Sequence, residues 1–410
     1  MNHEKAPGPA RSKRSSAARK SPSLVRTARA AGHGGKSLQF TPSKRLTVGV
    51  EWELGFVDRG TRDLTPAAPD VLEQLGPATS RIKPEIFQSM IEINTGICEN
   101  AEVARRDLDG SLRKILRAAD RVGVDVISGG THPFARYVGN AVYPSERYEM
   151  LMNRERWIAR RLMIFGLHVH LGMRDGDEAV SVLNGMLWWA PCLMALAANS
   201  PYWQGGDTGL ASARATVFES SPVAGHPCTY STWDEFVELY ASMLRAKAIR
   251  SIKDYWWDIR PQPDFGTIEL RFCDALPTLR ETIAVVALAH SIASRLVDQY
   301  RLGVRVAAPP MWMIRENKWR ASRLGLRANL VVSEGGRTRK AVDLVRELVS
   351  EVRPQARKLG SEDALLDVLD ILHQQNGATR QRTAFERRGQ LSDVVASLVR
   401  QLRTNRILAR

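Results

Sequence analysis

The sequence predicts an α+β protein in which a sheet with one polar face is backed by helices. Four segments alternate apolar and polar side chains with the period of two that is typical of a strand. Two longer segments, residues 236–248 and 280–300, repeat apolar side chains with the period of an α-helix. The chain has 410 residues, 44% of them hydrophobic, and can therefore bury a large core.

The first strand-like segment, GVEWELGFV at residues 49–57, has an unusual polar face. Its alternation places Trp52 and the other large apolar side chains on one face. Glu51 and Glu53, flanked by glycines, lie on the opposite face. Taken alone, this pattern also fits an ordinary sheet whose polar face is exposed to water. The remaining strands therefore decide whether the two glutamates have a chemical role.

The same arrangement recurs in three other segments. Their polar positions are Glu92 and Asn94 in SMIEINTG, His168 and His170 in GLHVHLG, and Glu269 and Arg271 in TIELRFCD. If neighbouring strands present these faces together, several carboxylates and an imidazole converge. With no thiolate nearby, such donors suit hard divalent ions such as Mg²⁺ or Mn²⁺. We interpret the flanking glycines as room for a ligand to approach the backbone.

Three arginines are candidates for binding an anionic substrate at such a cluster, because bound divalent ions often act on phosphate. They are Arg214 in ASARATVF, Arg260 in WWDIRPQPDFG and Arg271. Arginine is more often a surface residue, and each of the three also fits that interpretation. Arg271 is the strongest candidate because it shares a strand face with Glu269.

The positive charge of the chain is concentrated at its start. Residues 1–45 contain eleven Lys or Arg and one acid, which accounts for +10 of the formal net charge of +15. Because this segment has few large apolar residues, we predict that residues 1–42 form a disordered basic tail. The remaining +5 is spread over the rest of the chain, so nucleic-acid binding is not favoured.

Other features predict a protein of the cytoplasm that does not span a membrane. The segment 183–198 predicts a buried helix, and its apolar run, 186–198, is too short to cross a bilayer. No secretory h-region is present, and the four cysteines form no CxxC pair, which favours reduced thiols. Near the end of the chain we expect helices at 339–353, 361–374 and 390–403, with Ser361 as an N-cap.

A set of motifs also resembles a known family. In chain order they are GVEWEL, IEINTGIC, GGTHPF, ERY, FGLHVHLG, NSPYWQGGDTG, SARATVF, SIKDYWWDIRPQPDFGTIELRFCDALPT and NKWRASRLGL. Together they resemble the bacterial carboxylate–amine ligases of the YbdK type, also called glutamate–cysteine ligase type 2. The resemblance covers residues 43–400 and leaves out the basic tail. The long block around DIRPQPDFGTIELR is its most specific part.

The resemblance implies a glutamine-synthetase-like catalytic fold, in which a curved antiparallel sheet backed by helices binds ATP and Mg²⁺ on its concave face. It implies a single ligase domain at 43–405 that includes the C-terminal helices. It also implies ATP-dependent amide formation. A carboxylate, such as the γ-carboxylate of glutamate, is phosphorylated by ATP, and an amine such as that of cysteine attacks the acyl phosphate.

The resemblance also implies roles for individual residues. Residues that look like ligands of one metal ion are Glu53, His168 and Glu269. Those that look like ligands of further metal ions are Glu51, Glu92 and, from its spacing, Glu85; His170 is left open. Arg260 and Arg271 resemble the phosphate-stabilising cations and Arg214 a carboxylate clamp. Ser200 and Tyr202 fall in a loop expected to shape the pocket.

Two other classes of function stay open at this point. A metal-dependent hydrolase could use the same cluster to activate water. A nucleic-acid-binding protein could use the basic tail, and its binding would then depend strongly on salt. For the ligase, the expected partners are small molecules, namely ATP, an amino-acid carboxylate and an amine, without a membrane. Whether the chain forms a homodimer is left open.

Overall fold

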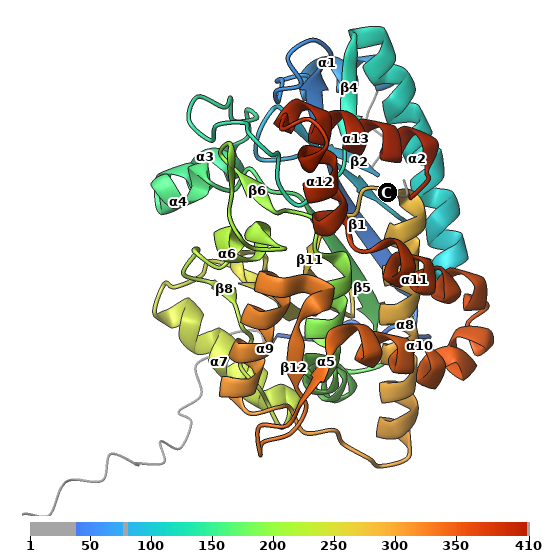
Figure 1. Ribbon diagram of the computed structural model, residues 1–410. Coiled ribbons are helices and arrows are strands. Elements are labelled where there is room, and N and C mark those ends of the chain that lie inside the picture. Colours follow the sequence, from blue (N-terminus) through green and yellow to red (C-terminus); the bar gives the residue numbers. More distant parts are fainter. Residues whose placement is uncertain (1–37, 77–80, 408–410) are drawn as a thin grey trace, which may run out of the picture. The chain divides into compact units, whose positions relative to one another are not determined.

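The four predicted strands lie in one sheet, with β1 near its centre. The computed structural model describes residues 38–76 and 81–407 (Figure 1). Across the main sheet the strands are β10 (Ile259–Gln262), β11 (Thr267–Asp274), β5 (Gly166–Gly172), β1 (Val48–Asp58), β3 (Met90–Asn94) and β2 (Ile82–Pro84), and β4 (Val124–Ile127) also pairs with β1. All of these pairs are antiparallel. The predicted α+β class is confirmed.

Five long helices form a layer on one face of this sheet (Figure 1). They are α2 (Ala101–Val122), α5 (Gly176–Ala197), α8 (Leu279–Arg301), α10 (Ala341–Lys358) and α11 (Glu362–Gln374). Helix α8 contacts β5 and is itself contacted by the other four, while α5 contacts β10 and β11 and α2 contacts β1. The main hydrophobic core therefore lies between the apolar face of the sheet and this layer.

The alternation in β1 explains why the sheet packs in this way. Val50, Trp52, Leu54 and Phe56 are at most 2% exposed, whereas Glu51 and Glu53 on the other face are partly exposed. Burying four large apolar side chains of one strand stabilises the fold by several kcal/mol, at about 1.5–3 kcal/mol each. This burial determines which face of β1 contacts the helices and leaves the two glutamates on the opposite face.

Shorter elements surround this core. The remaining helices are α1 (Ala68–Leu75), α3 (Glu146–Glu155), α4 (Trp157–Arg160), α6 (Ala213–Phe218), α7 (Trp233–Arg245), α9 (Met311–Leu324), α12 (Gly377–Glu386) and α13 (Leu391–Thr404). The two-stranded pairs are β6 (Tyr202–Trp203) with β7 (Gly206–Asp207), β8 (Ala224–Gly225) with β9 (Trp256–Trp257), and β12 (Asn329–Val331) with β13 (Thr338–Lys340). Helix α6 contacts β11, which places it beside the polar face described below.

The predicted C-terminal helices correspond to α10, α11 and α13, but α9 and α12 were missed. The buried side of α9 includes the polar Asn317 and Lys318, and that of α12 is Gly377, Ala378 and Gln381. Polar residues thus interrupt the apolar stripe of α9, and α12 has no such stripe, so the periodicity on which the sequence prediction relied is weak in both.

Ser361 occupies the N-cap position of α11, as predicted, but its side chain does not cap that helix. Its hydroxyl makes no capping hydrogen bond to α11 and instead accepts one from the N–H of Ala101, at 3.2 Å. Ser361 thus satisfies a backbone donor at the start of α2, a helix 260 residues away in the chain. A cap signal in the sequence cannot distinguish these two uses.

The described chain begins inside the segment that we predicted to be tail. Residues 1–37 of that prediction lie outside the described residues. Phe40 packs edge-on against Trp233, with the ring centroids 5.3 Å apart, and the N–H of Thr41 donates to the carbonyl of Pro263 at 2.9 Å. Residues 38–42 therefore contact the same compact unit as the sheet.

Among the described residues, only α5 is long and apolar enough to cross a membrane by length and composition. Within its most apolar window, 78% of the residues are buried inside the protein. The helix packs against α8 and α9 and against β11. A core helix meets the same criteria, so this one is weak evidence for a membrane span.

We expect Trp52 to contribute packing rather than chemistry. Its indole is fully buried and donates a hydrogen bond to the hydroxyl of Ser128 at 2.9 Å. Trp52→Phe removes this bond and leaves a gap, which we expect to lower the free energy of unfolding by about 1–3 kcal/mol. Urea unfolding measures the loss, and calorimetric titration with Mn²⁺ checks that metal binding is retained. Loss of metal binding in a folded variant would contradict this role.

Candidate active site

The strand register brings the predicted polar side chains together on one face. Glu53 lies opposite Glu92 across β1 and β3, and Glu51 lies opposite His168 across β1 and β5. On the other side of β5, His170 lies opposite Glu269 of β11. Directly opposed residues are close enough for their side chains to interact. Four strands that are far apart in the sequence thus contribute to a single polar surface.

This surface forms one wall of a cavity of about 300 Å³. Every predicted metal ligand lines it, together with the three predicted arginines. Residues of the lining that the sequence analysis missed include Lys83, Arg147, Tyr148, Lys253, Gln262 and Phe265. Gln262 could have been found, because it alternates with Arg260 along IRPQ and therefore shares its strand face. The others lie outside the regular alternation or on other elements.

Three groups of acidic and histidine side chains in the described chain have ligand atoms within 4.8 Å of one another. They are Glu51 with Glu92 and His168, Glu51 with His170 and Glu269, and Glu53 with Glu85 and Glu92. The implied set of Glu53, His168 and Glu269 is not one of these groups. Its members are nonetheless neighbours: His168 Nε2 is 3.7 Å from Glu53, and His168 Nδ1 is 3.9 Å from Glu269. His170, which was left open, has a place beside Glu51 and Glu269.

Burial and mutual repulsion shift three of these carboxyl groups toward the neutral form. Burial raises the pKa of Glu53 to about 7, although Arg214 opposes the shift. Burial and the charge of Glu53 raise the pKa of Glu85 to about 7. Burial, Glu51 and Glu85 raise the pKa of Glu92 well above its usual range. A cation bound among these crowded carboxyl groups would offset their repulsion and stabilise their ionised forms.

The two histidines differ in their environment. Burial, with the neighbouring charge of Arg271, lowers the pKa of His168 to about 4, so its ring is neutral near pH 7. Burial also disfavours the charged form of His170, but Glu269 and Glu51 raise its pKa above the usual value. Both rings contact Glu51, at 2.9 Å from His168 and 3.3 Å from His170. Against its own burial, these contacts hold the pKa of Glu51 well below its usual range.

Glu269 is held by the two arginines of its own hairpin. Arg260 Nε donates to one carboxylate oxygen at 2.8 Å, and Arg271 bonds to the other. Burial favours the neutral acid, but the two guanidinium groups keep the pKa of Glu269 well below its usual range. Arg260 also donates to the carbonyl of Tyr255 at 2.6 Å, which fixes its position. Both arginines thus lie in the cavity wall in a defined arrangement.

Arg214 reaches the cavity from α6. Its guanidinium is 2% exposed and donates to the carbonyl of Arg271 at 3.1 Å. The Nε atoms of Arg214 and Arg271 are buried without a hydrogen-bond partner in the described chain. A buried donor without a partner is costly, so an acceptor in the cavity would stabilise both groups.

The glycines on the polar face mostly make room for other side chains, not for a ligand as we had interpreted. A Cβ on Gly166 would meet Arg214, with the guanidinium carbon only 2.9 Å away. A Cβ on Gly55 would lie 2.8 Å from the ring of Phe165, and one on Gly172 would lie 2.6 Å from Ser43. Gly49 is the exception, because its Cβ would meet only His170 at 3.5 Å.

Ser200 and Tyr202 lie behind the cavity and do not line it. The hydroxyl of Ser200 donates to the buried carboxylate of Asp274 at 2.7 Å and accepts from the N–H of Arg214 at 3.1 Å. The ring of Tyr202 packs against Phe385, with the centroids 5.6 Å apart. Ser200 therefore supports Arg214, and Asp274 is a supporting residue that the sequence analysis missed.

The residues of the cluster fit a divalent cation. Their donors are carboxylate oxygens with imidazole nitrogens, the hard donor set of Mg²⁺ and Mn²⁺. None of the four described cysteines lies in the groups that could hold a metal. The pKa values of Glu53, Glu85 and Glu92 are raised, and a bound cation would lower them again by favouring the ionised carboxylates.

A solved structure identifies the class of fold. The chain is similar to the crystal structure of a glutamate–cysteine ligase from Francisella tularensis in complex with AMP, with a TM-score of 0.64 and 14% sequence identity. The similarity covers 90% of this chain and 91% of that one. The fold is thus that of the glutamine-synthetase-like ligases, as the motifs implied.

The sequence itself identifies the family. The model of glutamate–cysteine ligase family 2 matches residues 47–400. "Putative glutamate–cysteine ligase 2" of Bdellovibrio bacteriovorus is 42% identical over 363 residues, which cover 88% of this chain and 96% of that relative. The relative of the same name in Thermobifida fusca is 41% identical, over 90% of this chain and 93% of its own length. The chain belongs to glutamate–cysteine ligase family 2, and the resemblance is confirmed.

Because Arg214 lies so close to Gly166, we expect a side chain at position 166 to lower activity. Gly166→Ala displaces the guanidinium by its new methyl group, and we expect activity to fall by about 100-fold, the typical cost of misplacing a group by an ångström. Steady-state kinetics measures this loss, and Gly49→Ala, on the same face of the sheet in β1, is the matched control. Equal activity of the two variants would contradict the packing role of Gly166.

The raised pKa values predict that metal binding is linked to protons. Glu53 and Glu85 are partly protonated near pH 7, and a cation binds the ionised form. Mn²⁺ affinity should therefore fall as pH decreases through about 7, and binding at pH 7 should release protons. Calorimetry in buffers of different ionisation enthalpy measures this release. Binding without proton release would be inconsistent with the carboxyls being ligands.

Proposed function

We propose that the protein is an ATP-dependent carboxylate–amine ligase that forms an amide through an acyl phosphate. The observation that carries this proposal is the meeting, in one cavity, of three arginines and a cluster of glutamates and histidines that could hold divalent cations. Membership of glutamate–cysteine ligase family 2 supports the same reaction class. Divalent cations and arginines on one surface suit phosphoryl transfer, because its transition state carries charge over several oxygens.

The acidic cluster would hold the metal ions that accompany ATP. Glu51, Glu53, Glu85, Glu92 and Glu269 supply oxygen donors, and His168 and His170 supply nitrogen donors. When bound, Mg²⁺ or Mn²⁺ supplies charge that offsets the phosphate oxygens of ATP and orients them. The protein's part is to hold the ligands rigidly, which it does by placing them on adjacent strands of one sheet.

Arg260 and Arg271 are proposed to stabilise the transferring phosphoryl group. Both are already oriented by Glu269, so little reorganisation is needed when charge develops. The buried Nε of Arg271 is a further donor for a phosphate oxygen. Fixed cations in a buried site stabilise such charge more strongly than mobile ones in water.

Arg214 is proposed to bind the carboxylate substrate. Guanidinium groups bind carboxylates through two parallel hydrogen bonds, and the buried Nε of Arg214 is available for one. A substrate oxygen held there could attack the γ-phosphorus of ATP, which expels ADP. The amine nitrogen then attacks the acyl carbon, inorganic phosphate leaves, and the nitrogen loses a proton. Glutamate with cysteine or another amine is the proposed substrate pair.

We also propose a cellular setting and a set of partners for the enzyme. Cys98, Cys192, Cys228 and Cys273 are all free, which supports our proposal that the protein works in a reducing cytoplasm. Its proposed partners are small molecules, and we leave nucleic acid out of the proposal because no described feature of the site calls for it.

An ADP-release screen tests the proposed reaction. Glutamate and other amino acids are combined with a panel of amines in the presence of ATP and Mg²⁺, and products are identified by mass. We expect ADP formation to depend on both an acid and an amine, with an amide as product. Amide hydrolysis in the absence of nucleotide would instead identify a metal-dependent hydrolase and overturn the proposal.

Glu53→Gln tests the metal cluster within this mechanism. The change keeps the size of the side chain and its acceptor for the N–H of Gly166, but removes the charge. We expect turnover to fall by about 10²- to 10³-fold, with the melting temperature nearly unchanged. The exposed Glu73, changed to Gln, is the matched control. Near-normal turnover of Glu53→Gln would contradict the role of Glu53 as a metal ligand and the assignment of β1 to the active site.

A further inference from the structure

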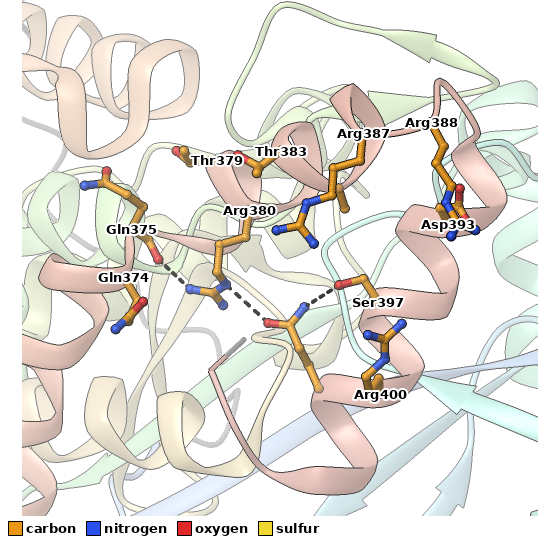
Figure 2. A pocket seen from close by; sticks show the side chains of 12 residues that line it. Gln374, Gln375, Thr379, Arg380, Thr383, Arg387, Arg388, Asp393, Ser397 and Arg400 are labelled. Atoms are coloured by element: carbon orange, nitrogen blue, oxygen red, sulfur yellow. Dashed lines mark hydrogen bonds and ion pairs between the residues drawn. The ribbon is translucent and has the colours of Figure 1, made fainter. Parts of the chain in front are cut away.

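A second polar cavity lies between α12 and α13, outside the proposed active site. Its volume is about 340 Å³, and none of its lining residues lines the first cavity. Figure 2 shows Arg380 extending from α12, Arg387 from the residue that follows this helix, and Ser397 and Arg400 from α13. A cavity of this size is at the lower end of those that bind small ligands.

The lining carries more positive than negative charge. Arg380, Arg387, Arg388 and Arg400 line the cavity, with Asp393 as the single acid. Asp393 is 4.0 Å from Arg388, and in the described part of the chain neither Arg387 nor Arg400 forms an ion pair. Guanidinium groups that converge without carboxylates repel one another unless an anion is bound.

One arginine of the cavity is fixed in place by buried groups. The side chain of Arg380 is 9% exposed and forms an ion pair with the fully buried Glu281 of α8. It also bonds to the carbonyl of Gln375 and, at 3.2 Å, to the side chain of Gln401 (Figure 2). Gln401 in turn donates to Ser397 at 3.3 Å. The floor of the cavity is therefore a connected polar network, while Arg387 and Arg400 are free to bind.

We propose that this cavity binds a small anion with at least two negative charges, of the phosphate or carboxylate class. Arginine is suited to both because its planar guanidinium matches two oxygens at once. Arg387 and Arg400 would provide the charge, and Thr383 and Ser397, which also line the cavity, would provide hydroxyl donors. An anion with several charges would offset the repulsion between arginines better than chloride.

Helix α12 also connects this cavity with Arg214 in the first one. Gln381, next to Arg380, donates to the side chain and carbonyl of Asn199, each at 2.8 Å. The N–H of Asn199 donates to Asp274 at 2.8 Å, and Asp274 binds the hydroxyls of Ser200 and Ser212 around the start of α6. Ordering of α12 by an anion would thus be transmitted to the helix that carries Arg214.

Calorimetric titration with inorganic pyrophosphate and with tricarballylate tests the binding. EDTA is present to remove divalent cations, so that neither anion is bound through a metal ion at the glutamate cluster of the first cavity. We expect the wild-type chain to bind one of these anions at one site per chain, less tightly at higher salt. Tighter binding of pyrophosphate would indicate a site for phosphate compounds, and tighter binding of tricarballylate would indicate a site for carboxylates.

Arg387→Gln and Arg400→Gln locate the site. Both side chains are exposed, so the fold should not depend on them. Each substitution should weaken binding by about tenfold or more, the typical effect of losing a charge-assisted hydrogen bond. Arg106→Gln, at an exposed arginine on α2, is the matched control and should bind normally. No binding by the wild-type chain, or equal binding by all variants, would overturn the proposal.

Hydrogen exchange tests the connection to α6 without any activity assay, so failure of the ligase proposal would not affect the result. Addition of the binding anion should slow amide exchange in α12 and also in α6. Slower exchange in α12 with no change in α6 would overturn the link to Arg214.

Discussion

The pairing register of β1 is the constraint on which the proposed site depends. It places Glu51 and Glu53 between Glu92 on one neighbouring strand and His168 on the other. A slip of one residue would turn both glutamates into the core and the buried Trp52 out of it, which the apolar packing forbids. Hydrophobic burial on one face of the sheet therefore determines the chemistry on the other.

The charges gathered on that face are balanced only in part. Glu269 is neutralised by two arginines, whereas Glu53, Glu85 and Glu92 are kept apart from comparable partners and have raised pKa values. Such crowding lowers stability in the absence of a cation, and proteins retain it where function requires it. The second cavity shows the opposite case, with an excess of arginines over carboxylates.

Local patterns predicted several of the helices and missed others, and an apolar stripe alone does not separate the two groups, because α2 buries one and was not predicted. Helix α8 follows from its periodicity and α5 from its apolar run, but α9 buries Asn317 and Lys318, which bond to the carbonyl of Val331 and to Asp258. Such polar contacts depend on partners that are remote in the sequence. The glycines beside the site gave a similar result, since the space at Gly166 is filled by Arg214 from another element.

The sequence by itself determined the alternation of the four strands, the acidic and histidine residues on one face, and the family to which the chain belongs. Side-chain alternation is a local property of an extended backbone, so it can be read without coordinates. Tertiary structure alone decided which carboxylates neighbour each histidine, how Arg214 reaches the cavity, and that Ser200 supports it from behind. These relations depend on which distant segments pack together, and that is settled by the burial of the whole core.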